Sequence, residues 1–157
     1  MAERDGIRVV ARNRKARHEY EILEEYEAGL VLRGAEVKSL RDGRASFMDS
    51  FARLEQGEVW LHNLHISPYE KASIDAPDPT RARKLLLHRR EIDRIGPRTT
   101  EGGLTLIPLD IHFRRGVAKV TLGLARGKKQ HDKRDDLKKR VMKREADRAV
   151  QDAQRTR

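Results

Sequence analysis

Histidine is the residue type through which this chain could most readily perform chemistry, and the sequence holds six histidines. His62 and His65 lie three residues apart in a predicted strand, and that spacing places them on opposite faces, where they cannot share a metal ion. His18-Glu19 lacks the second histidine of a metalloprotease motif, and no serine lies in a G-x-S-x-G motif. Neither a Walker A loop nor a G-x-G-x-x-G loop is found. The sequence therefore predicts a protein that is not an enzyme.

Lysine and arginine offer a second kind of chemistry, which is the binding of phosphate. The chain holds 35 lysines and arginines against 25 aspartates and glutamates, a formal net charge of +10. Residues 123–157 contain 13 basic and 6 acidic residues and carry +7, so the 122 residues before them carry only +3. Because phosphate contacts supply much of the affinity for nucleic acids, this charge predicts a polyanionic partner. The stretch from Gly127 to Arg134 combines a glycine, four basic residues and His131, and is the strongest candidate.

Aromatic rings can stack on nucleobases, and the chain has seven. Packing in a core is the commoner role for such rings, and stacking on bases is the functional alternative, so both interpretations stay open. Tyr69, which follows Ser67-Pro68, is the ring most expected at the surface. Five others lie in predicted strands: Tyr20, Tyr26, Phe51, Trp60 and Phe113.

Two-residue alternation of apolar side chains predicts five or six short strands that would position these groups. After a short basic lead, residues 20–26 alternate until Gly29, which predicts a strand bent or bulged at that glycine. Two hairpins are predicted, over residues 51–63 with a turn at Gln56-Gly57, and over residues 104–124 with a turn at residues 114–116.

Short helices are expected over residues 35–40 and 88–95, the second stopping at Gly96-Pro97. The run Leu85 to Leu87 is compatible with a strand or a helix, and residues 75–79 form a loop. The fold class is therefore mostly β with small helices. We expect an OB-type antiparallel β-barrel over residues 1–126, followed by a basic C-terminal tail over residues 127–157.

The tail contains good helix formers but few apolar residues: Leu137, Val141, Ala149 and Val150. Such a segment lacks the apolar area to fold alone, so we expect it to be disordered when free and helical when bound. Packing of the tail against the barrel is the alternative. The absence of cysteine, of an apolar leader and of an apolar run near the roughly 18 residues of a membrane span favours a cytoplasmic location. Attachment of the basic tail to a membrane surface stays open.

Four separated runs of sequence carry a family resemblance. They are NRKARHEYEI (13–22), EAGLVLRGAEVKSLRDG (27–43), DPTRARKLLL (78–87) and GLARGKKQHDKR (123–134). Together they resemble the small protein B family, the tmRNA-binding partner of bacterial trans-translation. The resemblance covers nearly the whole chain in the family's order, which makes it highly specific.

The resemblance implies an OB-type barrel that binds the tRNA-like domain of tmRNA at its elbow and D-loop. The family's contacts match Asn13 in N-[RK]-[RK]-A-R-H, Glu27 in E-A-G and the middle leucine of K-L-L-L, which is Leu86. Neighbouring residues are added on charge: Lys15, Arg17, His18 and Lys84.

A second implied site lies in the tail, where the family element GKK-x-x-DKR matches Gly127, Lys128, Lys129, Asp132, Lys133 and Arg134, with His131 between them. The resemblance implies that these residues approach the decoding centre of the small ribosomal subunit and that the helix after them lies in the vacant mRNA channel. It also implies delivery of alanyl-tmRNA with elongation factor Tu, without any cofactor or metal.

Two other classes of protein compete with this interpretation. Another OB-type binder, such as an initiation factor or a ribosomal protein, would explain the barrel and the charge but not the GKKQHDKR element before a helix-forming tail. A metal-dependent nuclease would need a ligand cluster, which the sequence does not supply.

Overall fold

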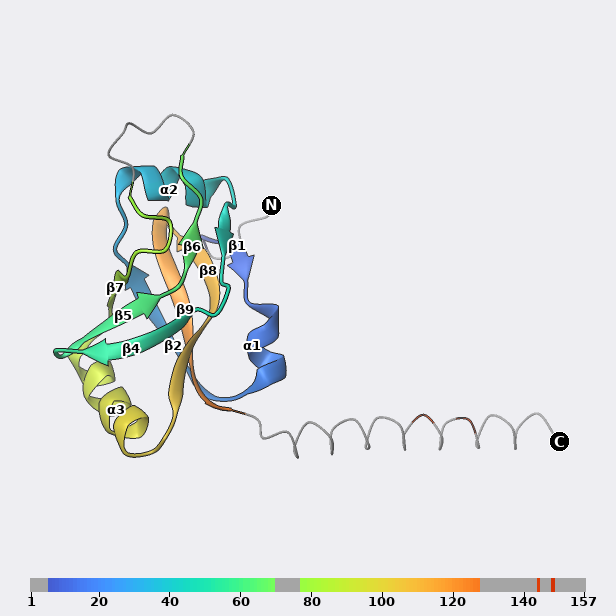
Figure 1. The fold of residues 1–157 in the computed structure, drawn as a ribbon, viewed down its shortest axis with the longest axis vertical. Helices are drawn as coiled ribbons and strands as arrows, with labels where there is room; N and C mark the ends of the chain where they lie inside the picture. The colour runs from blue at the N-terminus through green and yellow to red at the C-terminus, as the bar shows by residue number, and fades with distance from the viewer. Residues whose placement is uncertain (1–5, 70–76, 128–143, 145–147, 149–157) are drawn as a thin grey trace. The chain divides into compact units, whose positions relative to one another are not determined.

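The computed structural model of the protein describes residues 6–69 and 77–127, together with Arg144 and Arg148. The chain divides into two compact units, residues 1–127 and residues 128–157. The described part of the first unit is a mostly β body (Figure 1). Its elements, in chain order, are β1 (Ile7–Arg12), α1 (Arg14–Glu19), β2 (Tyr20–Leu30), α2 (Gly34–Arg41), β3 (Ala45–Ser46), β4 (Phe51–Glu55), β5 (Glu58–His62), β6 (His65–Ile66), β7 (Arg83–Leu86), α3 (Arg89–Thr100), β8 (Thr105–Arg114) and β9 (Val117–Gly127).

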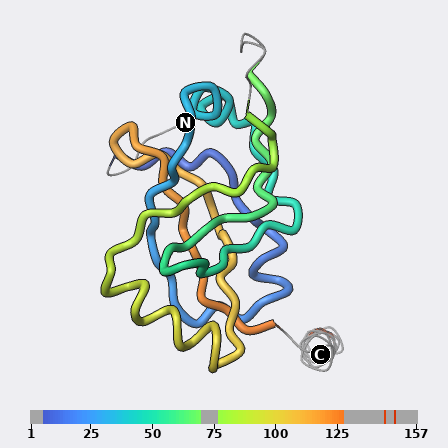
Figure 2. Tube along the Cα trace, turned by 60° about the vertical axis from the view of Figure 1, so that its left-hand side comes forward, coloured from blue at the N-terminus to red at the C-terminus, as the bar shows by residue number. Residues whose placement is uncertain are grey.

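The strands of the body pair antiparallel and close on themselves. Seven of them form one sheet in the order β1-β8-β4-β5-β7-β2-β9, and β8 pairs additionally with β9, which closes the sheet into a barrel. Strands β3 and β6 form a separate two-stranded sheet. The tube in Figure 2 follows this path, with α2 at one end of the barrel and α3 at the other. The predicted fold class, mostly antiparallel β with small helices, is confirmed.

Alternation along the strands decides which side chains fill the barrel. In β5 the inward residues Val59 and Leu61 are fully buried, and in β9 the same is true of Val120, Leu122 and Leu124. Full burial of each such side chain contributes about 1.5–3 kcal/mol relative to exposure. Side chains at the intervening positions point outward.

Both predicted hairpins and the first predicted helix are present. The turn residues Gln56 and Gly57 have φ angles of 50° and 77°, and Arg115 and Gly116 have φ angles of 50° and 81°. Two successive left-handed residues are what a two-residue hairpin loop requires, because their twist matches that of the flanking strands. Helix α2 covers the stretch predicted from residue 35 to residue 40.

The expectation of a basic lead before the first strand is wrong, because this stretch folds as β1 and α1. Strand β1 lies along the second half of β8. Helix α1 buries a single residue, Ala16, which packs against Ile107 and Leu109. One buried residue gives no apolar period, and for this reason the helix was not predicted.

The predicted bulge in β2 is also misplaced. The register shift lies between Ile22 and Glu24, and Gly29 sits in a regular ladder between Lys119 of β9 and Leu86 of β7. A Cβ atom at Gly29 would lie 3.2 Å from the Cβ atom of Leu86, so the glycine allows a close approach of side chain to backbone rather than a bend. The run from Leu85 to Leu87 was compatible with a strand or a helix. Its first two residues belong to strand β7.

Helix α3 does not stop at Gly96-Pro97 as predicted, but continues to Thr100. Gly96 is buried, and a Cβ atom placed on it would lie 3.3 Å from the Cδ2 atom of Leu54, so the helix packs closely on the barrel at this point. The hydroxyl groups of Thr99 and Thr100 donate hydrogen bonds to the carbonyl oxygen of Gly96, at 3.0 and 2.9 Å. The two hydroxyl groups thus add hydrogen bonds within the last turn, which continues past a proline that cannot donate a backbone hydrogen bond itself.

Glu24 of β2 fastens α3 to the sheet. Its Oε1 atom lies 2.8 Å from Nη2 of Arg94 and 2.6 Å from Nη1 of Arg98. The hydroxyl of Tyr26 also donates to Glu24. Hydrogen bonds from Tyr26, Arg98 and Arg94 lower the pKa of Glu24 to about 2, so the link stays charged in mild acid.

A buried ion cluster holds α2 to the strands beneath it. Glu36 of α2 is 4% exposed and Arg83 of β7 is fully buried, with 2.7 Å between Nε of Arg83 and Oε2 of Glu36. Arg83 also donates to the carbonyl oxygens of Leu64 and Pro79, and Arg81 donates to Glu36. Burial alone would raise the pKa of Glu36, but the hydrogen bonds from both arginines and from a backbone amide lower it overall.

Residues 128–157 form the second unit, of which Arg144 and Arg148 are described, both helical and exposed. The predictions for the tail, disordered when free and helical when bound, lie outside the described residues. No helix within the described ranges is long and apolar enough to cross a membrane.

The buried cluster predicts a large loss of stability when one partner is removed. We expect Glu36→Gln to lower the free energy of unfolding by about 3–5 kcal/mol, because Arg83 would remain buried without a counter-charge. Urea denaturation monitored by circular dichroism measures the loss. The matched control is Glu25→Gln, which breaks the exposed pair of Arg17 and Glu25 and is expected to cost less than about 1 kcal/mol. Equal losses in the two variants would contradict the role given to burial.

Candidate RNA-binding surface

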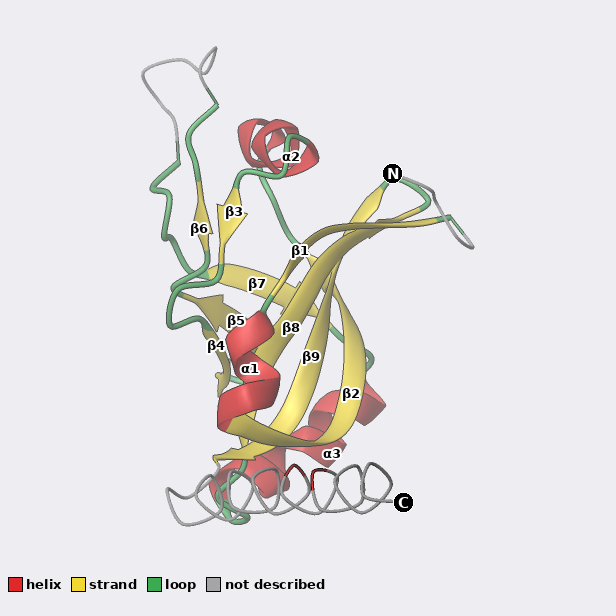
Figure 3. Cartoon of the chain, turned by 90° about the vertical axis from the view of Figure 1, so that its right-hand side faces the viewer, coloured by secondary structure: helices red, strands yellow, loops and turns green. Residues whose placement is uncertain are grey.

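A polar surface covers the outward side of β8, β9 and β2, which lie side by side in Figure 3. In β8 the outward residues Asp110, His112 and Arg114 alternate with buried Leu109, Ile111 and Phe113. Strand pairing continues two rows across the surface. One row joins Asp110, Thr121 and Glu27, and the other joins His112, Lys119, Gly29 and Leu86. We call this surface, with α1 beside it, the β8–β9–β2 face.

Glu27 is held at the centre of this face by two basic groups. The Nε and Nη2 atoms of Arg114 donate to its carboxylate at 3.0 and 2.8 Å. Nε2 of His112 lies 2.9 Å from the same carboxylate. The hydrogen bond from Arg114, and after it that from His112, lower the pKa of Glu27. The carboxylate is therefore ionised at neutral pH and fixed in one orientation on a surface that also carries Asp110 and the cations of α1.

His112 links Glu27 to a second carboxylate. Its ring is 5% exposed, and its Nδ1 atom lies 2.7 Å from Oδ1 of Asp110, which also accepts a hydrogen bond of 2.9 Å from the hydroxyl of Thr121. Asp110 first, and Glu27 after it, raise the pKa of His112, while burial opposes them. When it is protonated, the ring donates from both nitrogens and joins β8 to β2, while Thr121 of β9 reaches the same cluster through Asp110.

Asn13, at the start of α1, is fixed to β8 through its nitrogen atoms. Its backbone amide donates to the carbonyl oxygen of Leu109 at 2.8 Å, and its Nδ2 atom donates to the carbonyl oxygen of Pro108 at 2.9 Å. Within the described ranges, no donor to its carboxamide oxygen is found. Asn13 therefore presents an oriented acceptor beside the β8–β9–β2 face.

Three recesses meet at Asn13. One is lined by Arg12, Arg14, Arg17 and Asp110, so it joins the cations of α1 to the carboxylate bound by His112. A second continues along Arg12, Arg14 and Lys15 towards residues 45–48. Phosphate groups of a bound RNA would find closely spaced cations along these two recesses.

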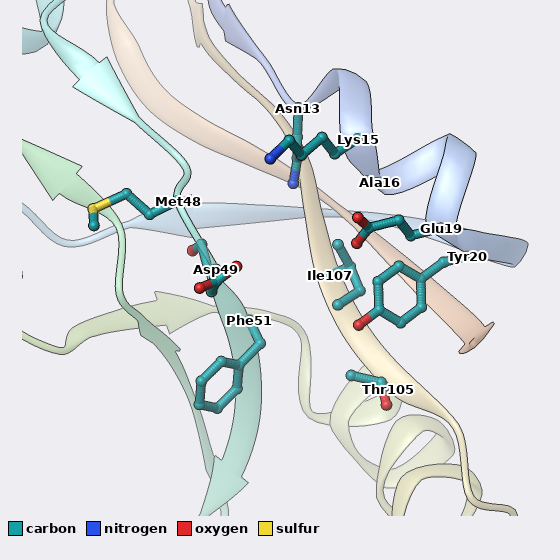
Figure 4. A pocket seen from close by; sticks show the side chains of 11 residues that line it. Asn13, Lys15, Ala16, Glu19, Tyr20, Met48, Asp49, Phe51, Thr105 and Ile107 are labelled. Atoms are coloured by element: carbon teal, nitrogen blue, oxygen red, sulfur yellow. The ribbon is translucent and has the colours of Figure 1, made fainter. Parts of the chain in front are cut away.

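The third recess lies between α1 and the connection from β3 to β4 (Figure 4). Asn13 and Lys15 stand at one side, Met48 and Asp49 at the other, and the ring of Tyr20 lies near Ile107. Met48 has a left-handed φ of 48° and is 64% exposed, which is an unusual arrangement for an apolar side chain. Polar, cationic and aromatic groups therefore converge next to Asn13.

Lys84 and Leu86 extend the β8–β9–β2 face onto the neighbouring strand β7. Leu86 is 54% exposed and covers Gly29, in the same row as Lys119 and His112. The ammonium of Lys84 lies 3.9 Å from a carboxylate oxygen of Glu58. Leu86 is thus an exposed apolar contact at the edge of a charged surface.

The remaining predicted site residues are placed as follows. Lys15, Arg17 and His18 are exposed on α1, and Arg17 pairs with Glu25 at 2.7 Å. Gly127 is the last residue of β9 and pairs with Tyr20. The other predicted tail residues lie outside the described residues: Lys128, Lys129, His131, Asp132, Lys133 and Arg134.

Sequence reasoning missed the groups that hold Glu27 in place. Asp110, His112 and Arg114 occupy every second position of a predicted strand, and Thr121 follows in its hairpin partner. Polar residues at every second position of a strand indicate its outward side. This spacing would have predicted that the four side chains lie on one face.

Comparison with known proteins shows the family of this chain. The model of the family described as "SmpB protein" matches residues 10–152. The chain belongs to the SmpB family. The resemblance to small protein B is thereby confirmed.

Relatives of this SmpB-family chain match it over nearly their whole length. An SsrA-binding protein of Geobacillus thermodenitrificans is 55% identical over 148 residues, which cover 94% of this chain and 96% of the relative. An SsrA-binding protein of Desulforudis audaxviator is 57% identical over 147 residues, with the same two coverages. A chain in a solved structure described as "tmRNA-SmpB: a journey to the center of the bacterial ribosome" has a TM-score of 0.65 and 55% identity, covering 81% of this chain and 93% of that one.

The ion network of this SmpB-family body predicts a dependence of stability on pH. The pKa of His112 is raised above its ordinary value of 6.5. A raised pKa contributes stability that is fully present below the unfolded value and is lost as the pH rises through the folded value. We therefore expect the free energy of unfolding to fall as the pH rises from about 6.5 through the raised pKa of His112, and His112→Gln to remove this fall. Urea denaturation across that range tests the expectation, which fails if both proteins show the same slope.

Proposed function

We propose that this protein binds the tRNA-like domain of tmRNA through the β8–β9–β2 face and carries it to stalled ribosomes, where trans-translation rescues the ribosome and tags the peptide. The observation that carries the proposal is the fixed pair of acceptors, the Glu27 carboxylate and the Asn13 carboxamide, among exposed cations. Relatives named SsrA-binding proteins and a solved structure of tmRNA with SmpB in the ribosome support it.

The face suits a folded RNA better than a random single strand. Arg12, Arg14 and Arg17 line the recess beside Asn13, and cations in such a place bind phosphates without reading sequence. A carboxylate repels phosphate, so Glu27 excludes a backbone that crosses it. Each of its oxygens can accept more than one hydrogen bond, which allows it to receive an amino, imino or 2′-hydroxyl donor in addition to its present partners. Leu86 would add an apolar contact at the edge.

In this proposal the protein acts as an adaptor and performs no chemistry itself. The relatives' names describe binding and not a reaction. Because charged side chains supply the binding, no cofactor is needed. We infer a cytoplasmic location from this role, and we infer that elongation factor Tu joins the complex through the alanyl-tmRNA.

The tail would engage the ribosome. Residues 123–157 carry +7, and a channel that normally holds mRNA is lined by ribosomal RNA phosphate, which attracts such a segment. We propose that Lys128, Lys129, Lys133 and Arg134 contact phosphates near the decoding centre, with His131 beside them. If the tail orders only on arrival, mRNA in the channel denies it the contacts that offset the ordering cost, and this selects stalled ribosomes.

A gel-shift competition between tmRNA and an equal mass of tRNA tests the binding proposal. We expect a marked preference for tmRNA, and we expect Asn13→Ala and Leu86→Ala each to weaken tmRNA binding about tenfold, which corresponds to about 1.4 kcal/mol. The control is Val117→Ala, which shortens an equally exposed apolar side chain at the tip of the last hairpin. Equal binding of tRNA and tmRNA would instead favour a generic OB-type binder.

The tail proposal predicts a change in salt dependence. Replacing Lys128, Lys129, Lys133 and Arg134 with alanine should reduce the slope of log K against log salt for ribosome association by about 3, because each lost phosphate contact removes about 0.7–0.9. Sedimentation with ribosomes over a series of salt concentrations gives the slope, and tmRNA binding by the body serves as the control. An unchanged slope would remove the phosphate contacts from the proposal.

A further inference from the structure

A second outward surface of the barrel, on β4, β5 and β7, carries aromatic and basic side chains in register. Strand pairing places Phe51 opposite His62, and Arg53 opposite Trp60. Trp60 is also opposite Lys84 of β7. Since inward neighbours on these strands are buried, these five side chains share the outer side. We call them the β4–β5 platform.

Two of the three rings of the platform are stacked on each other. Phe51 and His62 lie with centroids 5.2 Å apart and planes inclined by 19°. The guanidinium of Arg53 lies 5.9 Å from the centroid of the Phe51 ring. Phe51, Trp60 and His62 are all partly exposed. Phe51 also packs against the small core cluster of Ala16, Ile107, Leu109 and Ala125, so it has both a packing role and an exposed part. Burial is incomplete for each of the three rings, which leaves each with surface that a ligand can reach.

Among the residues that the structure describes, the carboxylates that contact Arg53, Lys84 and the ring of His62 are partly exposed. Arg53 and His62 both contact Glu55, at 3.0 and 2.8 Å, and Lys84 lies 3.9 Å from Glu58. The carboxylates of Glu55 and Glu58 are 37% and 43% exposed. Exposed ion pairs contribute little to stability, so a phosphate could compete with these partners for Arg53 and Lys84.

The platform is continuous with the β8–β9–β2 face. Lys84 and Leu86 lie two residues apart on β7 and share its outer side, and Leu86 covers Gly29 in the row that ends at His112. An RNA bound at Glu27 can therefore continue over Leu86 onto Trp60 without leaving the barrel surface. Cations alternating with rings suit unpaired bases, whose faces stack on the rings while their phosphates reach the cations.

We propose that the β4–β5 platform binds an unpaired, single-stranded segment of RNA, with a base stacked on Trp60 and phosphates near Arg53 and Lys84. The inference rests on the proposed function, to which it adds a second contact of different chemistry. A base-paired helix hides its base faces, so it does not qualify as the occupant. A protein segment would be an alternative occupant, and the test below separates the two.

Trp60 is the only tryptophan in the chain, so its fluorescence reports on this platform directly. The full-length protein is titrated with an eight-nucleotide oligouridylate, with an eight-nucleotide oligoadenylate, and with a blunt RNA duplex of the same length. We expect saturable quenching by both single strands and at least about tenfold weaker binding of the duplex. No quenching by either single strand, or equal quenching by the duplex, would overturn the proposal and favour a protein partner.

Variants separate a binding role from a structural one. Phe51→Leu, which keeps the reporter, is expected to weaken the oligonucleotide about fivefold to tenfold, since a stacking surface is lost. Glu58→Gln should tighten binding about twofold or more by releasing Lys84, and a gain of affinity cannot come from misfolding. Tyr69→Leu is the matched control, because it removes a partly exposed ring that also carries a cation, Lys38, at 5.5 Å. It should leave the oligonucleotide affinity unchanged.

The two proposals can fail separately. If the oligonucleotides do not quench Trp60 while tmRNA is still preferred over tRNA, the platform is withdrawn and the proposed function stands. If quenching is seen but tmRNA is not preferred, the proposed function is withdrawn and the platform remains a single-strand site. Weakening by Tyr69→Leu equal to that by Phe51→Leu would also count against the platform.

Discussion

Strand β8 is the constraint on which the body depends, because it pairs with β1, β4 and β9. Its inward residues, among them Ile111 and Phe113, fill the barrel, while Asp110, His112 and Arg114 stand on the outer side. A shift of one residue in its register would exchange these two sets, burying charge and exposing the core. Closure of the barrel and the layout of the β8–β9–β2 face are therefore fixed by the same pairing.

An acidic residue in a surface for RNA needs a physical explanation, and the ion network provides one. Glu27 is neutralised within the sheet by Arg114 and by His112, so it adds little negative potential at a distance. At short range it still excludes phosphate and accepts donors. Discrimination can thus come from the carboxylate, while attraction comes from the exposed cations of α1. Separating the two tasks lets the face remain attractive to RNA and selective for its shape.

The sequence predicted the parts of the fold that repeat with a clear period. Two hairpins follow from the alternation around Trp60 and around Ile107, and α2 from its spacing between glycines. Strand β1 and helix α1 were missed, because α1 buries only Ala16 and its binding to the barrel is a tertiary effect. The end of α3 was predicted too early, at Gly96-Pro97. The helix continues to Thr100, and the hydroxyl groups of Thr99 and Thr100 donate to the carbonyl oxygen of Gly96 in this last turn. Asn13 and Glu27 were singled out by family resemblance alone, whereas their partners Pro108 and His112 come from distant positions that no local pattern connects.

Gly29 has no side chain, and this affects the shape of the outer surface of the barrel. Between the long side chains of Lys119 and Leu86 there is only backbone, and Leu86 leans over it at close range. Leu86 therefore occupies the space over the glycine and lies low against the sheet. Any larger residue at position 29 would push Leu86 outward, so the contour of the surface, and not only its charge, is set by the smallest amino acid in β2.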